Sequence, residues 1–167
     1  MKKYALTLIV LLAAIFILTT TIYAEAVVEI FDEWTVYQDQ DSTTGQMNIS
    51  IHQMTDYAIP LYISFYQGQR TISIVPRDLD KAADTLEVDY SFDEGAMQTV
   101  TCNINEYKRS FYFPDGIEKS FIEQMTNHEE LRVEFFRTPD AEKTILIYDL
   151  NKFNEALENY KDLLLSN

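Results

Sequence analysis

The sequence predicts an α+β domain: an antiparallel β-sheet, curved or sandwich-like, with two helices packed on it, after an N-terminal signal peptide. Most of the chain beyond residue 26 alternates apolar and polar side chains, which is typical of strands with one buried face. Two segments instead repeat apolar residues at helical spacing. The chain shows no internal repeat and no linker, so we expect residues 1–26 to be the signal peptide and residues 27–167 to form one domain.

The N-terminus has the layout of a cleaved secretory signal. Lys2 and Lys3 precede an apolar run from Ala5 to Leu18, and the small-residue site Ala24-Glu25-Ala26 follows. We therefore expect cleavage after Ala26 and export to the periplasm or the extracellular space. An uncleaved membrane anchor is the alternative, because residues 4–23 reach the length of about 20 residues that a spanning helix needs.

The strands are expected in two groups. Clear alternation covers residues 61–66, 72–74, 86–92, 100–104, 131–136 and 144–149, and weaker alternation covers 34–37, 47–52 and 109–113. Within the first of these, Leu61, Ile63 and Phe65 share one face, so Tyr62 and Tyr66 point to the other. Short turns at residues 67–69 and 93–95 join neighbouring strands, which implies antiparallel pairing.

A first helix is predicted within residues 113–127. Asp115 can cap its first turn, and Glu118 three residues later can complete a capping box. Ile117, Phe121 and Met125 are spaced by four residues and form one apolar stripe.

A second helix is predicted to follow Asp149, at the point where strand alternation ends. Its apolar stripe consists of Leu150, Phe153, Leu157, Tyr160 and Leu164. Asp149 could be read as an active-site carboxylate, but a carboxylate before a helix accepts from the free backbone N–H groups there. We interpret Asp149 as a helix cap.

The polar residues show no catalytic or metal-binding pattern, so no catalytic residue, metal or cofactor is predicted. His52 and His128 lack ligand spacing, and the sequence has neither a nucleophile elbow nor a phosphate-binding loop. Cys102, the only cysteine, falls between inward-facing Val100 and Ile104, so we expect a buried, unreactive thiol. The stretch from Asp39 to Gly45 departs from calcium-loop spacing and is predicted to be a polar turn.

The chain is strongly acidic, with a net charge of −14 that becomes −15 when Lys2, Lys3 and Glu25 are removed. Nucleic acid needs Lys and Arg to neutralise its phosphates, so a nucleic-acid partner is not expected. A protein partner, and a basic one in particular, fits the charge. The plainer alternative is that the charge serves solubility alone.

A possible interaction surface consists of outward aromatic residues and an acidic connection between strands. Its members are Tyr62, Tyr66, Phe136, Asp78, Asp80 and Asp84. Exposed aromatic residues can anchor a partner. Alternatively, one of the two helices covers the aromatic residues, and we favour this alternative because both helical stripes need a surface to pack on. For the three acids, the alternative is that they belong to a solvated loop.

Three motifs in the second half of the chain resemble those of the VasI/TagO-like group of small exported proteins, which is associated with type VI secretion. They are SFDEG at 91–95, FYFPDG at 111–116 and YDLNKFNEAL at 148–157. This chain differs from the group in having a single cysteine and in carrying Lys152 in place of a glycine. The resemblance implies an exported protein of similar fold, and it carries over no catalytic residue.

We expect an exported, non-catalytic binding or accessory module of the cell envelope, with no stable membrane anchor if the signal is cleaved. The alternative is a carboxylate-based hydrolase of cell-wall or sugar polymers, which would need a cleft with two acids of raised pKa. A membrane-tethered assembly component is a third possibility, and it requires the N-terminal segment to be retained.

Overall fold

The protein is mostly one large antiparallel sheet. The computed structural model describes residues 26–55, 58–107 and 109–165, so the predicted signal segment before Ala26 lies outside the described residues. Strands account for 47% of the structure and helices for 14%. The expected α+β class with two helices packed on a sheet is therefore wrong: the described chain forms a ten-stranded antiparallel sheet with three short helices.

The sheet order departs from the chain order in its second half. The strands are β1 (Val27–Phe31), β2 (Trp34–Gln40), β3 (Met47–Met54), β4 (Pro60–Tyr66), β5 (Gln69–Ile74), β6 (Thr85–Phe92), β7 (Gln98–Ile104), β8 (Phe111–Tyr112), β9 (Glu130–Phe136) and β10 (Lys143–Asp149). Their order in the sheet is β1-β2-β3-β4-β5-β8-β7-β6-β9-β10. Among these strands β1 and β10 are the two edges.

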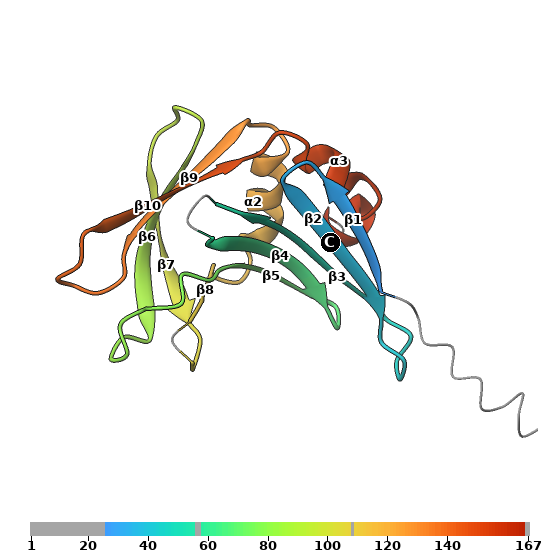
Figure 1. The fold of residues 1–167 in the computed structure, drawn as a ribbon, viewed down its shortest axis with the longest axis horizontal. Helices are drawn as coiled ribbons and strands as arrows, with labels where there is room; N and C mark the ends of the chain where they lie inside the picture. The colour runs from blue at the N-terminus through green and yellow to red at the C-terminus, as the bar shows by residue number, and fades with distance from the viewer. Residues whose placement is uncertain (1–25, 56–57, 108, 166–167) are drawn as a thin grey trace, which may run out of the picture.

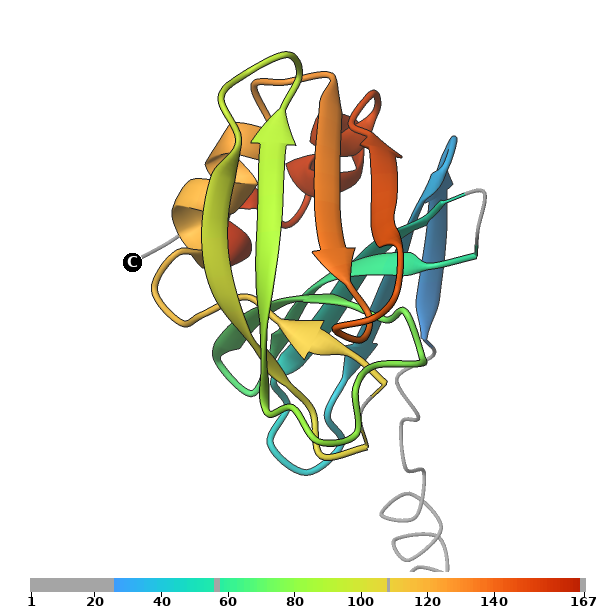
Figure 2. The same ribbon diagram turned by 90° about the vertical axis from the view of Figure 1, so that its left-hand side faces the viewer.

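The sheet bends at the short strand β8, so its two parts face each other (Figures 1 and 2). We call β1–β5 the N-terminal half-sheet and β6, β7, β9 and β10 the C-terminal half-sheet. Strand β8 joins them by pairing with β5 on one side and β7 on the other. Across the interior, the rings of Phe111 and Phe135 lie 5.1 Å apart, and the Tyr148 hydroxyl donates to the carbonyl of Ile59 at 3.4 Å.

The core lies between the two half-sheets and follows the predicted alternation. The inward side chains include Val36, Ile51, Leu61, Ile63, Ile72 and Ile74 from one half-sheet and Val88, Leu131, Val133, Phe135, Leu146 and Tyr148 from the other. All of these are at most 1% exposed. Because side chains alternate along a strand, their neighbours point outward, and these outer faces are the surfaces open to a partner.

The strand predictions are confirmed at most positions. The turn at Gln67-Gly68 has both residues at positive φ, 50° and 81°, as a tight hairpin requires. Strand β1 was not predicted, because its sequence VVEIF does not alternate clearly. The weak alternation over 109–113 corresponds only to β8, which has two residues.

The first helix, α2 (Glu118–Met125), is shorter than predicted. Phe121 and Met125 are buried as the stripe indicates. The capping prediction for Asp115 is wrong, since Ile117 occupies the N-cap without a side-chain hydrogen bond. Glu118 instead accepts from the Gly116 backbone N–H at 2.7 Å, which tightens the turn before the helix.

The second predicted helix is divided into α3 (Phe153–Glu158) and α4 (Lys161–Leu165), although its whole apolar stripe is buried as predicted. Asp149 is not its N-cap. That position belongs to Lys152, which has a φ of 66° and makes no side-chain cap bond. The Asp149 carboxylate accepts from the Asn151 N–H at 2.8 Å, so it stabilises the turn that leaves β10.

The three helices gather on one side of the molecule, where they close the space between the half-sheets (Figures 1 and 2). Helix α3 places Phe153 against Trp34 of β2, with ring centroids 4.8 Å apart, and α2 places Phe121 against Tyr90 and Phe113. No helix in the described part of the chain is long and apolar enough to cross a membrane. The three helices close the core, and none of them covers the outer faces of the sheet.

Candidate interaction surface

The residues predicted for an interaction surface do not meet in one place. Tyr62 and Tyr66 lie on the outer face of β4, whereas Phe136 ends β9 in the C-terminal half-sheet. The three acids Asp78, Asp80 and Asp84 occupy the connection between β5 and β6. The sequence prediction therefore separates into two regions.

The second region combines Phe136 with the acidic connection. Asp80 and Phe136 line a hollow of about 220 Å³. Asp78 and Asp80 also line a neighbouring hollow of about 800 Å³, together with the basic residues Arg77, Lys81 and Arg109. Because these cations offset the acids, the connection is not the strongly acidic surface that the sequence suggested.

The expectation that a helix covers the outward aromatic residues is wrong. Tyr66 is 54% exposed and Phe136 is 48% exposed. The apolar residues of the helices pack into the gap between the half-sheets and not onto the outer faces of the sheet.

The outer face of the N-terminal half-sheet carries an aromatic ladder across three strands. His52 on β3 lies opposite Tyr62 on β4, and the two ring centroids are 5.1 Å apart. On its other side His52 stacks on Tyr37 of β2, at 5.3 Å and an interplanar angle of 6°. Burial between the two rings lowers the pKa of His52 from its usual value of 6.5, so its imidazole is neutral at pH 7.

Beside this ladder is a hollow of about 430 Å³, which we call the tyrosine hollow. Tyr37 on β2 and Tyr66 on β4 are among its lining residues, and Ser50 and Ser64 lie between them. The register places Tyr37 opposite Ser50, and Ser50 opposite Ser64. The hollow exists because two short side chains follow one another across the sheet between larger ones.

Polar groups line one end of the tyrosine hollow. Asp39 and Asn48 face each other across β2 and β3, and both contribute to its lining. The Asp39 carboxylate forms no hydrogen bond or ion pair with the residues that the structure describes. The amide oxygen of Asn48 is buried, also without a hydrogen-bond partner among them. The hollow thus combines aromatic surface with unpaired acceptor groups.

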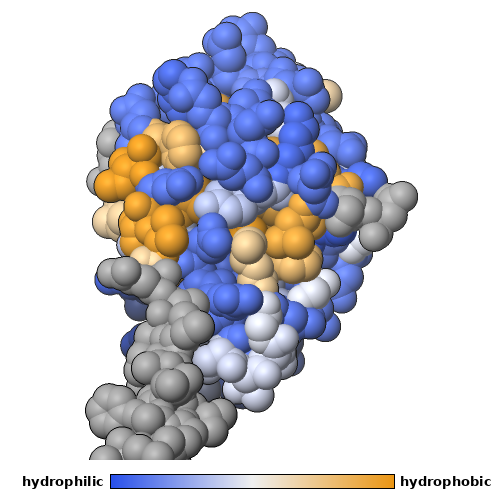
Figure 3. All heavy atoms as spheres, turned by 90° about the vertical axis from the view of Figure 1, so that its right-hand side faces the viewer, coloured by the Kyte–Doolittle hydropathy of each residue, from blue (hydrophilic) through white to orange (hydrophobic). Residues whose placement is uncertain are grey.

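The tyrosine hollow adjoins the edge strand β1. Figure 3 shows apolar patches on the side of the molecule where this strand lies. The exposed apolar residues of β1 are Val27, Val28 and Ile30, of which Ile30 is 72% exposed. Val28 and Ile30 lie opposite Tyr37 and Thr35 of β2, so these two residues continue the face that carries the hollow, whereas Val27 lies opposite Gln38.

Sequence reasoning found Tyr62 and Tyr66 on this face but missed Tyr37, His52 and Asp39. The same alternation places Tyr37 and His52 outward, since their neighbours Val36 and Ile51 are buried. Alternation along each strand does not by itself give the register that sets these residues side by side.

An acidic hollow of about 600 Å³ lies at the end of the C-terminal half-sheet. Asp149 belongs to it, with Asp93, Glu94, Glu129 and Glu130. A hydrogen bond with His128 at 2.8 Å, followed by bonds from backbone N–H groups, lowers the pKa of Asp93. No group of three or more His, Cys, Asp or Glu residues in the described ranges is arranged to hold a metal ion.

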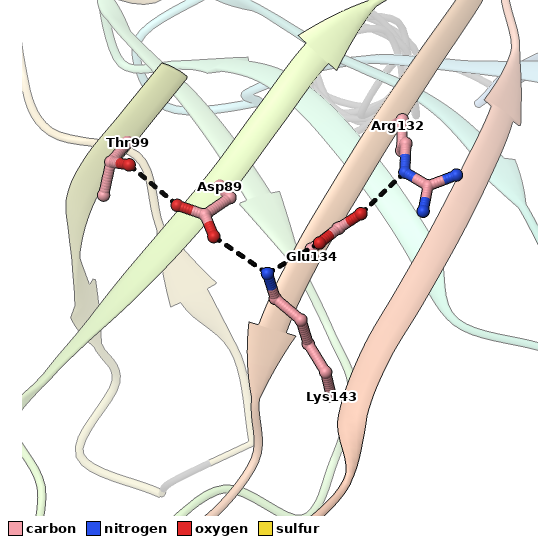
Figure 4. A network of polar contacts seen from close by, with 5 residues as sticks. All are labelled: Asp89, Thr99, Arg132, Glu134 and Lys143. Atoms are coloured by element: carbon pink, nitrogen blue, oxygen red, sulfur yellow. Dashed lines mark hydrogen bonds and ion pairs between the residues drawn. The ribbon is translucent and has the colours of Figure 1, made fainter. Parts of the chain in front are cut away.

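Two other carboxylates form a polar network on the outer face of the C-terminal half-sheet (Figure 4). Asp89 and Glu134 lie opposite each other, and Lys143 contacts both, at 3.0 and 2.6 Å. Arg132 also pairs with Glu134, and Thr99 donates to Asp89. These contacts lower the pKa of both carboxyl groups, so the pair lacks the protonated acid that the hydrolase alternative requires.

The sequence comparisons do not place the chain in a family: no protein-family model and no curated protein matches it. They therefore add no support for the VasI/TagO-like group.

Among solved structures, the crystal structure of invasion associated protein B from Bartonella henselae is similar. The two chains share 13% sequence identity and a TM-score of 0.56, and the similarity covers 82% of this chain and 97% of the other. At this identity the similarity concerns the fold alone: the chain has a fold like that of invasion associated protein B.

Proposed function

We propose that the protein is an exported binding module, without catalytic activity of its own, that recognises a basic protein partner. The observation that carries this proposal is the outer face of the N-terminal half-sheet, which no described helix covers. It presents Tyr37, His52, Tyr62 and Tyr66 beside the tyrosine hollow. Tyrosine supplies large contact area at a small entropic cost and is enriched where proteins bind partners.

Charge and compartment agree with this proposal. The net charge of −14 speeds the approach of a cationic partner and disfavours anionic ones. The signal-like N-terminus and the resemblance to VasI/TagO-like exported proteins support a location in the cell envelope or outside the cell. A cationic envelope protein such as a lysozyme is one partner of this kind.

The test is retention of basic proteins by the immobilised protein. Envelope extract and purified lysozyme are passed over the wild-type protein and over a Tyr37→Ser/Tyr66→Ser variant, at low and at high ionic strength. We expect the wild type to retain a basic protein at low ionic strength and to release it at high, because salt screens exposed charges. The double variant should retain much less.

Tyr107→Ser is the matched control. Tyr107 is 73% exposed and lies in the β7–β8 connection, away from the tyrosine hollow. Its replacement removes an exposed tyrosine without touching the proposed surface, so retention should not change. If no basic protein is retained at low ionic strength, or if the double variant retains as much as Tyr107→Ser, the proposed function is wrong.

A further inference from the structure

We propose that the tyrosine hollow accepts a single cationic side chain, an arginine or a lysine, projecting from the basic partner. This inference rests on the proposed function and names the chemistry of the group recognised there. It is carried by the placement of Tyr37, Tyr66 and Asp39 around one hollow.

The walls of the hollow suit the stem and the head of such a side chain. Arginine and lysine carry apolar stems of three or four methylene groups, which lie well against aromatic surface. A cation within about 6 Å of a tyrosine ring is also attracted by the ring face. Strands β2 and β4 are two strand spacings of about 4.8 Å apart, which leaves room for one side chain between Tyr37 and Tyr66.

The polar end of the hollow supplies the matching charge. Asp39 is the one carboxylate among the described lining residues, and no described residue pairs with it. A guanidinium binds a carboxylate through two parallel N–H donors and an ammonium binds it as a point charge, so either can pair with Asp39.

The neighbouring polar groups can accept hydrogen bonds from a cationic head group. The Ser50 and Ser64 hydroxyls contact each other at 3.4 Å. Asn48 has a buried amide oxygen without a hydrogen-bond partner among the described residues, and an unpaired buried acceptor is costly. Guanidinium and ammonium groups offer donors only, and the Asp39 carboxylate and the serine hydroxyl oxygens can accept from them.

The test uses a short acetylated peptide with one arginine, followed by two-dimensional amide NMR of the purified protein. The same peptide with citrulline, which keeps the planar shape but lacks the charge, is the matched ligand. We expect the arginine peptide to shift the amide signals of Ser50, Ser64 and Tyr66, and citrulline to shift them far less. Asp39→Asn should weaken arginine-peptide binding about fivefold, the size of one exposed ion pair.

Asp140→Asn is the control for net charge. Asp140 is exposed in the β9–β10 connection, so its replacement removes the same charge far from the hollow in the sheet order. Its effect on peptide affinity should stay below about twofold, since salt screens distant charges. Equal weakening by Asp39→Asn and Asp140→Asn would show that only overall charge matters and would overturn the inference.

Three further results would overturn it. The first is that the citrulline peptide binds as tightly as the arginine peptide. The second is that the arginine peptide shifts only amide signals of the acidic hollow, at Glu129 and Glu130. The third is that a neutral oligosaccharide shifts the Ser50 and Ser64 amide signals and the arginine peptide does not. Each of these leaves the proposed function standing if the Tyr37→Ser/Tyr66→Ser variant still loses its basic partner. If the wild type retains no basic protein either, both proposals are wrong.

Discussion

The indole of Trp34 donates a hydrogen bond from Nε1 to the backbone carbonyl of Asp149 at 3.0 Å, although the two residues are 115 positions apart. Trp34 begins β2 and Asp149 ends β10, so this bond joins the two half-sheets. The ring is fully buried and packs on Phe153 at the start of α3. The sequence break between strand and helix at Asp149 is therefore also a second place, besides β8, where the two half-sheets are joined.

Replacing Trp34 with phenylalanine should lower the free energy of unfolding by about 1–3 kcal/mol, because the Asp149 carbonyl loses its donor while an aromatic ring remains. Urea denaturation followed by circular dichroism measures this, since Trp34 is the only tryptophan and its fluorescence is lost with it. Tyr107→Phe is the control and should stay within about 0.5 kcal/mol of the wild type. An unchanged midpoint for Trp34→Phe would contradict the role assigned to this bond.

Glu134→Gln should destabilise the protein by about 1–2 kcal/mol at pH 7, because Glu134 is nearly buried and pairs with Lys143 and Arg132. The hydrogen bond from Lys143, then that from Arg132, lowers the pKa of Glu134. A lowered folded-state pKa stabilises the fold above the unfolded value of about 4.3 and loses this contribution as the pH falls further. The difference in the free energy of unfolding between Glu134→Gln and the wild type should therefore become smaller towards pH 3.

Urea midpoints at pH 7 and pH 3 test this prediction, with Glu142→Gln as the control. Glu142 is exposed and has no partner among the described residues, so its replacement should leave the midpoint almost unchanged at both values. If the urea midpoint of Glu134→Gln differs from that of the wild type by the same amount at both pH values, packing and not ionisation accounts for the loss of stability.

Asp93 should tolerate asparagine better than alanine. Its φ of 49° lies in the left-handed region, which asparagine adopts more readily than alanine, and its carboxylate accepts from the N–H groups of Glu129 and Glu130. The amide oxygen of an asparagine at this position could keep these two bonds. Asp93→Ala should therefore lower the melting temperature more than Asp93→Asn, and equal melting temperatures would contradict this reasoning.

The same residue should contribute to acid sensitivity. The hydrogen bond with His128 and the two backbone bonds hold the pKa of Asp93 below its usual value, so its stabilising effect is present above about pH 4 and fades as the pH falls. Melting curves from pH 7 to pH 3 should show the wild type approaching the Asp93→Ala variant. Parallel curves would show that the carboxylate charge is unimportant here.

Cys102 should resist thiol reagents in the native protein. It is fully buried, and burial raises its pKa to about 12, so the reactive thiolate is scarce at pH 8. Labelling with a disulfide reagent should be slow in buffer and rapid in urea, with a rate that follows unfolding. Rapid labelling without urea would show that the strand β7 opens locally.

Export with cleavage after Ala26 predicts a mature protein that begins at Val27. Strand β1 also begins at Val27, which pairs with Gln38, so cleavage there would leave the whole sheet intact. The intact mass of the protein recovered outside the cytoplasm checks this prediction. A mass that includes residues 1–26 would favour the membrane-tethered alternative.

The period-two pattern was the most reliable signal in the sequence. It identified the buried faces of β4, β6, β7 and β9 and placed Tyr62 and Tyr66 outward, because alternation is a local property of an extended chain. The helical stripes were correct about burial for every member except Ile117, which is only partly buried. The apolar pattern does not show at which residue a helix begins. The helices begin later than predicted, at Glu118 and Phe153, so the prediction that Asp115 and Asp149 are their N-caps is wrong.

The sequence by itself determined most of the strands, though not β1, together with their inward and outward faces, the burial of Cys102 and the acidic charge, since each depends on neighbouring residues or on composition. Only the tertiary structure decided that one sheet bends at β8, that the helices fill the gap between its halves, and that Tyr37, Asp39 and Tyr66 surround one hollow. These features depend on pairing register between strands, which involves residues far apart along the chain. Alternation along a single strand does not give that register, which in a hairpin also depends on the type and length of the turn.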